Sequence, residues 1–336
     1  MTELWRIKKC DLPAWLNIWR EEYELWGARP EGPVMRYGPV ADATELVLQV
    51  RTRDSAKNMF FPATETMFSF RHDEQGLELN QQLPELKARL LVGLPSCDLQ
   101  ALLVMDNVFG GGGHADPYYS GRRQYTVVVG VACEPGEFCF CQDFGFGPDT
   151  PTGADLFLWD DGSNWLAQAF SEAGARLLQA GDWEKVQATV PNRSGPGGWV
   201  SADSVARLRE RFDDPRWERL GERCLGCGAC AYVCPTCHCF DIDDMPHGLE
   251  GGERYRRWDT CAFAGFTAAA GHNPRPDQTG RIRQRVMHKL VYGDFRSDRS
   301  LCVGCGRCVA ACPAGIDIRA IAREAVREKK EVKAGA

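Results

Sequence analysis

The sequence CLGCGACAYVCPTCHCF, residues 224–240, holds six cysteines within sixteen positions. A related stretch, CVGCGRCVAACP at residues 302–313, repeats the cysteine, glycine and proline positions of CLGCGACAYVCP later in the chain. Both stretches have the spacing C-x2-C-x2-C-x3-C-P. One tetrahedral metal site takes only four ligands, so this density of thiols indicates more than one metal centre in the last third of the chain.

The repeated spacing is the bacterial ferredoxin pattern for 4Fe-4S clusters, in which three thiolates wrap one cluster and the fourth binds the other. Two matching runs that end in proline favour this interpretation over a pair of zinc sites, since zinc ribbons use separate cysteine pairs. Clusters that exchange ligands lie close together, and close pairs pass electrons, so the motif predicts a redox relay. The expected ligands are Cys224, Cys227, Cys230 and Cys312 for the first cluster, and Cys302, Cys305, Cys308 and Cys234 for the second.

Four more cysteines follow predicted strands in the first part of the chain. Cys97 lies in GLPSCDLQAL, and Cys133, Cys139 and Cys141 lie in GVACEPGEFCFC. The carboxyl ends of strands in an open α/β sheet form the usual crevice for a ligand, so these thiols are candidate ligands of a third 4Fe-4S cluster. The alternative is that they are buried, inert cysteines. Cys10 stands alone and is interpreted as a structural or incidental thiol.

Three cysteines belong to neither group: Cys237 and Cys239 in PTCHC, and Cys261 in RRWDTC. They are possible ligands of a further metal together with His238 or a carboxylate. They are also possible alternative ligands of the third cluster, or reduced thiols that line the relay. The remaining histidines, including His288, are expected to be surface or core residues.

The cysteine distribution divides the 336-residue chain, because five of the sixteen cysteines precede residue 215 and eleven follow it. We expect an α/β domain over residues 1–215 and a mostly helical, dicluster ferredoxin-like domain over residues 216–336. The expected strands are Glu45–Val50, Ala88–Leu94, Tyr125–Val131 and Ala154–Trp159. The expected helices are an amphipathic helix at the N-terminus, Leu99–Val108, Trp165–Leu178, a helix after Ser201, and residues 317–332.

The net charge of −6 and a pI near 5.6 argue against a nucleic-acid surface. Two short basic clusters, Arg254–Arg257 and Arg281–Arg285, are interpreted as solvated faces or subunit contacts. No run of apolar residues is long enough for a membrane span, and the N-terminus lacks the apolar core of a secretory signal. We therefore expect a cytoplasmic protein, where clustered thiols bind metal or do redox chemistry more often than they form disulfides.

Beyond the ferredoxin pattern, several motifs occur in a familiar order: GERCLGCGACAYVCPTCHCFDIDD, RYRRWDTC, RIRQRVMHKLVY and LCVGCGRCVAACPAGIDI. Together with GLPSCDLQAL and DPYYSGRRQYTVVVGVACEPGEFCFC, they resemble the four-iron dicluster electron-transfer subunit family. That family includes the beta subunit of cytoplasmic NiFe sulfhydrogenases, the A subunit of anaerobic sulfite reductase, and the B subunit of flavin oxidoreductases of heterodisulfide-reductase-like complexes. The resemblance covers roughly residues 90–318, and no motif matches within residues 1–85.

The resemblance implies an electron-transfer subunit without a substrate of its own. In such assemblies a flavoprotein NAD(P)H oxidoreductase subunit exchanges electrons with the dicluster subunit, which passes them to or from a terminal redox enzyme: a hydrogenase, a sulfite reductase or a heterodisulfide-reductase-like enzyme. No flavin is expected on this chain. The first alternative is a catalytic oxidoreductase that binds flavin in the N-terminal crevice, and the second is a redox or oxygen sensor.

Overall fold

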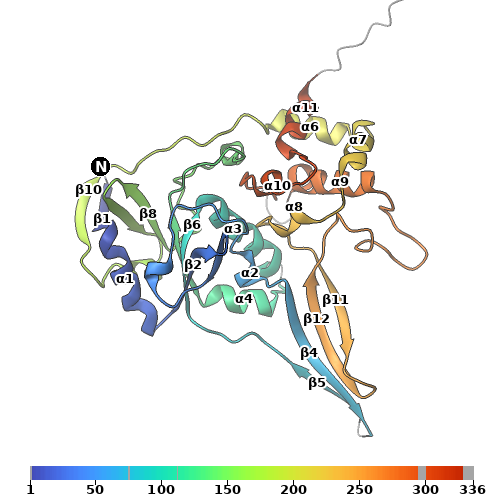
Figure 1. The fold of residues 1–336 in the computed structure, drawn as a ribbon, viewed down its shortest axis with the longest axis horizontal. Helices are drawn as coiled ribbons and strands as arrows, with labels where there is room; N and C mark the ends of the chain where they lie inside the picture. Colours follow the sequence, from blue (N-terminus) through green and yellow to red (C-terminus); the bar gives the residue numbers. More distant parts are fainter. Residues whose placement is uncertain (1, 75, 112, 294–299, 328–336) are drawn as a thin grey trace, which may run out of the picture.

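The computed structural model describes residues 2–74, 76–111, 113–293 and 300–327, and the N-terminal part is built on one large mixed sheet (Figure 1). Strands β2, β6, β7 and β8 run parallel to one another. At one side β3 pairs antiparallel with β2. At the other side each of the neighbouring pairs β8–β9, β9–β1 and β1–β10 is antiparallel. The spatial order is β10 (Glu184–Ala188), β1 (Thr2–Lys8), β9 (Asn164–Ala169), β8 (Leu156–Asp161), β7 (Thr126–Val131), β6 (Arg89–Pro95), β2 (Glu24–Glu31) and β3 (Val34–Pro39). The predicted α/β class of this part is therefore confirmed.

The central strands are apolar over most of their length because both faces of the sheet are covered. On β6, Leu90 and Val92 pack into one hydrophobic core with helix α1 (Leu12–Ile18). Leu91 packs into a second core, on the opposite face, with α3 (Ser96–Gly110). Three further helices complete the N-terminal part: α2 (Lys57–Phe60), α4 (Pro117–Gln124) and α5 (Glu172–Leu177).

A second sheet is formed by two long hairpins that project from the body of the molecule (Figure 1). Its order is β11 (Phe240–Pro246), β12 (Gly251–Trp258), β4 (Thr64–Asp73) and β5 (Gly76–Gln81), and all neighbours are antiparallel. Strands β4 and β12 come from opposite sides of the boundary predicted near residue 215. This pairing ties the two parts of the chain together.

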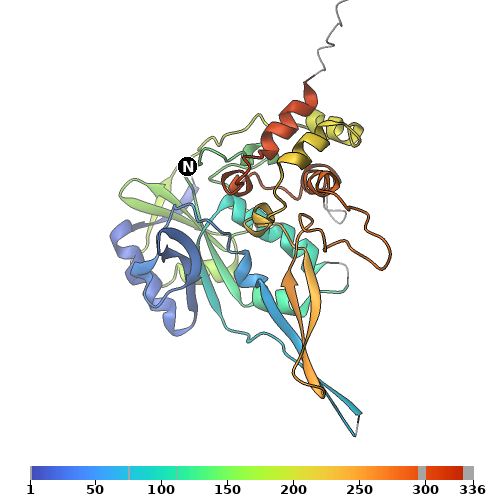
Figure 2. The same cartoon turned by 45° about the vertical axis from the view of Figure 1, so that its right-hand side comes forward.

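The C-terminal part is a group of short helices (Figure 2). Their buried side chains form a third hydrophobic core. Trp217, Val286 and Ile321 are among the residues buried there, and Phe140 from the N-terminal part joins them. The helices are α6 (Ala202–Glu210), α7 (Arg216–Arg223), α8 (Ala229–Tyr232), α9 (Gln278–Met287), which continues as a π-helical turn over His288–Tyr292, α10 (Arg307–Ala310) and α11 (Ile318–Val326).

The predicted elements agree with the structure best where the pattern is a long apolar strand. Three of the four expected strands are present as β6, β7 and β8. The expected strand Glu45–Val50 is wrong: Asp42 caps a single turn of 3₁₀ helix over Ala43–Glu45, and irregular chain follows. The leucines of that segment pack against the core without strand pairing.

Two helix predictions were wrong because each merged two elements. The segment Trp165–Leu178 contains β9 and α5, separated by a turn in which Ser171 caps the helix. The opening amphipathic helix is β1 followed by α1. The helices after Ser201 and Asp317 are confirmed as α6 and α11, although residues 328–332 of the second prediction lie outside the described residues. No helix within the described residues is both long and apolar enough to cross a membrane.

The basic cluster Arg254–Arg257 is only partly the solvated face that was predicted, because Arg256 is buried. Its Nη2 atom lies 2.7 Å from Oε2 of Glu65 on β4, and it also pairs with Asp116, which caps α4. Arg256 thus joins β12, β4 and α4 through one desolvated ion-pair network.

We predict that Arg256→Leu lowers the free energy of unfolding by about 3 kcal/mol, because it leaves buried carboxylates undercompensated. The matched control is Arg254→Leu, two residues along the same strand. The Arg254 side chain is 44% exposed and pairs with Asp244 at 2.7 Å, so its loss should leave the urea midpoint nearly unchanged. Anaerobic urea denaturation followed by tryptophan fluorescence measures both. Equal, small changes would contradict the structural role of Arg256.

Candidate metal centres

The two ferredoxin motifs fold into loops of the same backbone conformation. Gly226 and Gly228 have φ angles of +63° and +73°, and Gly304 and Gly306 have φ angles of +61° and +72°. Only glycine adopts this left-handed region without penalty. Each loop leads into a single-turn helix, α8 or α10, and the fourth cysteine of each motif follows that helix. The repeat seen in the sequence is therefore a structural repeat.

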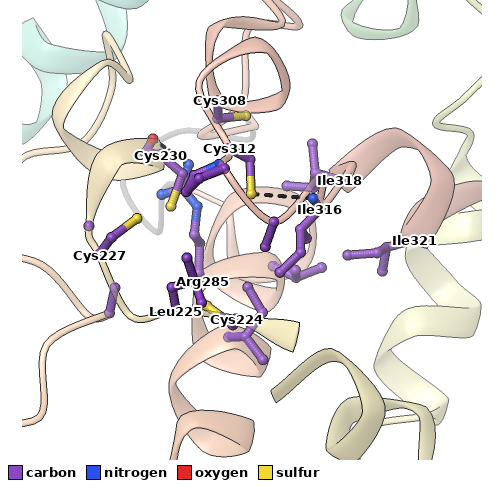
Figure 3. Close-up of a pocket in the computed structure, with 16 residues that line it drawn as sticks. Cys224, Leu225, Cys227, Cys230, Arg285, Cys308, Cys312, Ile316, Ile318 and Ile321 are labelled. Carbon is purple, nitrogen blue, oxygen red and sulfur yellow. Dashed lines mark hydrogen bonds between the residues drawn. The ribbon is translucent and has the colours of Figure 1, made fainter. Parts of the chain in front are cut away.

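The first cavity brings together thiols from both motifs (Figure 3). Cys224, Cys227 and Cys230 line it from one loop, and Cys312 lines it from the other. Its volume is about 590 Å³, and most of its remaining wall is aliphatic, formed by Ile282, Val286, Ile316, Ile318 and Ile321. Two sulfur atoms accept hydrogen bonds: Gln278 Nε2 donates to Cys224 at 3.1 Å, and the Ile316 amide donates to Cys312 at 3.3 Å.

The second cavity has the reciprocal composition and a volume of about 340 Å³. Its wall includes Cys302, Cys305 and Cys308 of the second motif together with Cys234 of the first. Cys308 lines both cavities, so the two lie next to each other. Burial raises the pKa of Cys308 to about 12 and raises that of Cys302 further. Such thiols become thiolates only when a positive charge compensates for the lost hydration.

Two buried cations supply positive charge at these cavities. Arg285 of α9 is 6% exposed, lines both cavities, and donates from Nη2 to the Cys230 carbonyl at 2.7 Å. Lys289, in the π-helical turn, is 3% exposed, and its Nζ donates to Thr236 Oγ1 at 2.8 Å. Burial disfavours the charged lysine, but nearby thiols, Cys234 first among them, raise its pKa above the usual value. The predicted solvated face at Arg281–Arg285 is thus wrong for Arg285.

The described residues contain no group of three or more Cys, His, Asp or Glu side chains close enough to hold a single metal ion. A zinc site needs four donors at about 2.0–2.3 Å from one atom. Within the described residues, the four thiols that line each cavity do not form such a preformed site.

The four cysteines of the α/β part gather at the carboxyl ends of two neighbouring parallel strands. Cys97 lies in the first turn of α3 after β6, and Cys133 lies two residues beyond the end of β7. Burial raises the pKa of Cys133 to about 12, and the neighbouring Cys139 and Cys141 raise it too. Burial likewise raises the pKa of Cys97. The predicted convergence of the two segments is present.

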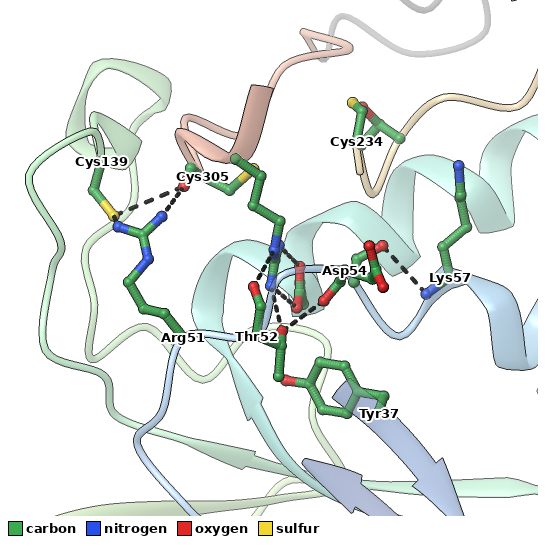
Figure 4. Close-up of polar contacts among 12 residues, drawn as sticks. Tyr37, Arg51, Thr52, Asp54, Lys57, Cys139, Cys234 and Cys305 are labelled. Atoms are coloured by element: carbon green, nitrogen blue, oxygen red, sulfur yellow. Dashed lines mark hydrogen bonds and ion pairs between the residues drawn. The ribbon is translucent and has the colours of Figure 1, made fainter. Parts of the chain in front are cut away.

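This group lies against the second ferredoxin loop. Arg51 bridges the two, since its Nη1 donates to Cys139 Sγ at 3.1 Å and its Nη2 donates to the Cys305 carbonyl at 2.9 Å (Figure 4). Arg307 of α10 forms a buried bidentate pair with Asp98, next to Cys97, at 2.6 and 2.7 Å. Both arginines fix the α/β part against the ferredoxin loop.

The last three cysteines, Cys237, Cys239 and Cys261, line a third cavity that also includes His238 and His288. Cys10 is exposed, as befits an incidental thiol. The functional residues that sequence reasoning missed are mainly cations, namely Arg51, Arg285, Lys289 and Arg307. Arg307 lies inside a motif and Arg285 and Lys289 lie between the two motifs, but Arg51 is far from every motif in the sequence, and none of these signals reveals burial.

Comparisons with known proteins agree with the geometry. Residues 223–316 match the model of a 4Fe-4S dicluster domain. The resemblance to the dicluster subunit family is confirmed. The chain is 29% identical, over 326 residues, to sulfhydrogenase 2 subunit beta of Pyrococcus furiosus, and the match covers 91% of this chain and 93% of that protein. The similarity thus extends into the segment before residue 86, where no motif was found. No solved structure matches.

We predict that Gly304→Ala destabilises the protein by several kcal/mol. An added Cβ would lie 2.5 Å from backbone atoms of Phe140, and the φ angle of +61° is already unfavourable for alanine. The matched control is Gly315→Ala, where φ is +63° but nothing lies within 4 Å of the added atom, so only the backbone cost of about 1–2 kcal/mol applies. Urea midpoints measure the difference. If the two variants lost equal amounts of unfolding free energy, the contact between residue 304 and Phe140 would not contribute to stability.

Proposed function

We propose that this chain is the iron–sulfur electron-transfer subunit of a sulfhydrogenase-like complex. The observation that supports this most is the exchange of cysteines, since each of two adjacent cavities is lined by three thiols of one motif and the fourth thiol of the other. Bound there, 4Fe-4S clusters supply one-electron carriers. The protein provides the thiolates, an aliphatic wall that excludes water, and buried cations that offset their negative charge.

We assign Cys224, Cys227, Cys230 and Cys312 to the first cluster, and Cys302, Cys305, Cys308 and Cys234 to the second. We assign the dicluster ferredoxin-like domain to residues 216–336, mostly helical apart from the β11–β12 hairpin, and the α/β domain to residues 1–215, although α6 (Ala202–Glu210) packs in the hydrophobic core of the C-terminal part. The hairpin and the Arg51 and Arg307 contacts hold the two domains in one arrangement.

The first site is the one through which electrons are exchanged with a partner subunit. Cys227 is exposed, and the neighbouring Leu225 is 69% exposed. By contrast, Leu301 and Val303 next to the second site are buried. An exposed leucine beside a cluster ligand provides an apolar contact for a partner without lengthening the electron path.

We further assign Cys97, Cys133, Cys139 and Cys141 to a third 4Fe-4S cluster. The mutual proximity of these thiols and their contact with the loop of Cys305 support this assignment. The cation of Arg51 on Cys139 Sγ supplies charge compensation. This site of the α/β domain would extend the relay from the second ferredoxin-type site into that domain.

The proposed partners follow from the relative, which is named as a subunit of a sulfhydrogenase. They are a terminal redox enzyme, with a hydrogenase as the first candidate, and a flavoprotein NAD(P)H oxidoreductase subunit, in the cytoplasm. No flavin is assigned to this chain.

The function is tested by anaerobic stopped-flow spectroscopy of the holo chain with NADH or NADPH, with and without a flavoprotein NAD(P)H oxidoreductase subunit purified from the same cells. We expect the visible iron–sulfur absorption to bleach only when the flavoprotein is present. Tightly bound flavin on the isolated chain, with direct oxidation of the nicotinamide, would instead favour the catalytic alternative. If the iron–sulfur absorption bleached neither with nor without the flavoprotein, the result would contradict the proposed relay.

Ligand exchange makes a separate prediction about the serine variants of the two motifs. Cys312→Ser should leave the same residual EPR signal as Cys224→Ser, although Cys312 belongs to the other motif, and Cys302→Ser should leave the signal of the other cluster. Cys10→Ser is the matched control and should leave both signals unchanged, because its side chain is exposed and far from either motif in the sequence. If Cys312→Ser instead matched Cys302→Ser, each motif would hold its own cluster.

A further inference from the structure

We propose that the third cavity holds an additional iron–sulfur cluster, bound by the thiolates of Cys237, Cys239 and Cys261 and by the imidazole of His238. This site lies beside the two ferredoxin-type sites and is separate from the cysteines of the α/β domain. Its presence does not depend on the proposed relay, because no other site is assigned its ligands, whereas the redox role given to it below rests on the proposed function.

The backbone brings the three thiols together from two segments. Cys237 and Cys239 lie in the turn between α8 and β11, and Cys261 follows the end of β12. The amide of Asp259 donates to the Cys239 carbonyl at 3.1 Å, which pins the end of the hairpin to the turn. Both segments therefore present their thiols to one space.

That space resembles the second ferredoxin-type cavity in its lining. Thiols, Arg285 and Lys289 line both. Its three thiols are not paired as disulfides.

The same buried cations that serve the ferredoxin-type sites also serve this one. Arg285 lines all three cavities and donates from Nη1 to Cys237 Sγ at 3.4 Å. Lys289 lines this cavity and the second. Lys57 of α2 donates to the Cys237 carbonyl at 3.0 Å and lies 3.8 Å from the centre of the Trp258 ring. The two buried cations in the wall of the cavity, with Lys57 at the backbone of Cys237, fit an anionic metal centre.

His238 has the arrangement that histidine ligands commonly show. Its Nδ1 lies 3.0 Å from the Thr236 carbonyl, which can only accept, so Nδ1 carries the proton and Nε2 is left as the basic atom. Metal-binding histidines usually donate their other ring N–H in this way. The ring also contacts His288, at 5.7 Å between centroids, and Phe109, which restrict its orientation.

The donor set has a consequence for redox behaviour. Replacing thiolate by imidazole raises the reduction potential of an iron–sulfur centre. The proposed cluster should therefore accept an electron before the clusters that are bound by cysteine alone, and should serve as the electron store of the subunit.

The test compares the anaerobically purified full-length chain with Cys261→Ser, Cys239→Ser and the matched control Cys10→Ser. We expect each of the first two to lose about four irons and the corresponding sulfide per chain, with the signals of the ferredoxin-type clusters retained. The control should lose none. Iron and sulfide contents that stay equal to the control would overturn the proposal, as would one zinc per chain at this site.

A second measurement uses the unmodified chain and so does not depend on how the variants fold. In a potentiometric titration, the first EPR signal to appear on reduction should carry nitrogen hyperfine coupling in pulsed EPR. His238→Ala should abolish the coupling. Absence of the coupling from every signal, or its survival in His238→Ala, would overturn the ligation by His238. If only the proposed electron transfer from the flavoprotein failed, the stopped-flow experiment would show no bleaching, while the EPR signal with nitrogen coupling would still be present.

Discussion

The reciprocal placement of the fourth cysteines is the constraint on which the rest of the structure depends. For Cys312 to enter the first cavity and Cys234 the second, the loops of the two motifs must face each other, although they lie far apart in the sequence. The chain between the two motifs forms the β11–β12 hairpin and α9. It thereby brings the second motif back next to the first. The hairpin pairs with β4 on the way, which fixes the position of the α/β part as well.

Burying thiolates creates an electrostatic problem that the helix α9 and its π-helical extension resolve. A buried thiol resists ionisation, and the raised pKa values of Cys302 and Cys308 reflect this. Arg285 and Lys289 stand four residues apart in the sequence, and both reach inward toward the cysteines. π-Helical turns are rare and occur frequently at functional sites, and here the turn that begins at His288 carries Lys289. One short helical segment thus provides charge compensation for the whole set of cavities.

Much of this arrangement was predictable from the sequence, because cysteine spacing and long apolar strands are local signals. The sets of thiols that line the two ferredoxin-type cavities were predicted from spacing, and β6, β7 and β8 from their apolar runs. The hairpin β11–β12 was not predicted, since FDIDDMP and GGERYRRW carry many charges and pair with a distant strand. Arg256 and Arg285 looked like surface residues because a basic run does not reveal which of its members is buried. Their partners, Glu65 and the cysteines, are brought near only by the tertiary fold.

The most direct test of the account is the EPR spectrum of the anaerobically purified chain after full reduction with dithionite. Two 4Fe-4S clusters in adjacent cavities that share Cys308 in their walls should interact magnetically, which predicts a broadened, split signal that simplifies when either cluster is removed by Cys224→Ser or Cys302→Ser. Two sharp, independent signals would contradict the adjacent pair. A protein that contains zinc and gives no iron–sulfur signal would contradict the relay altogether.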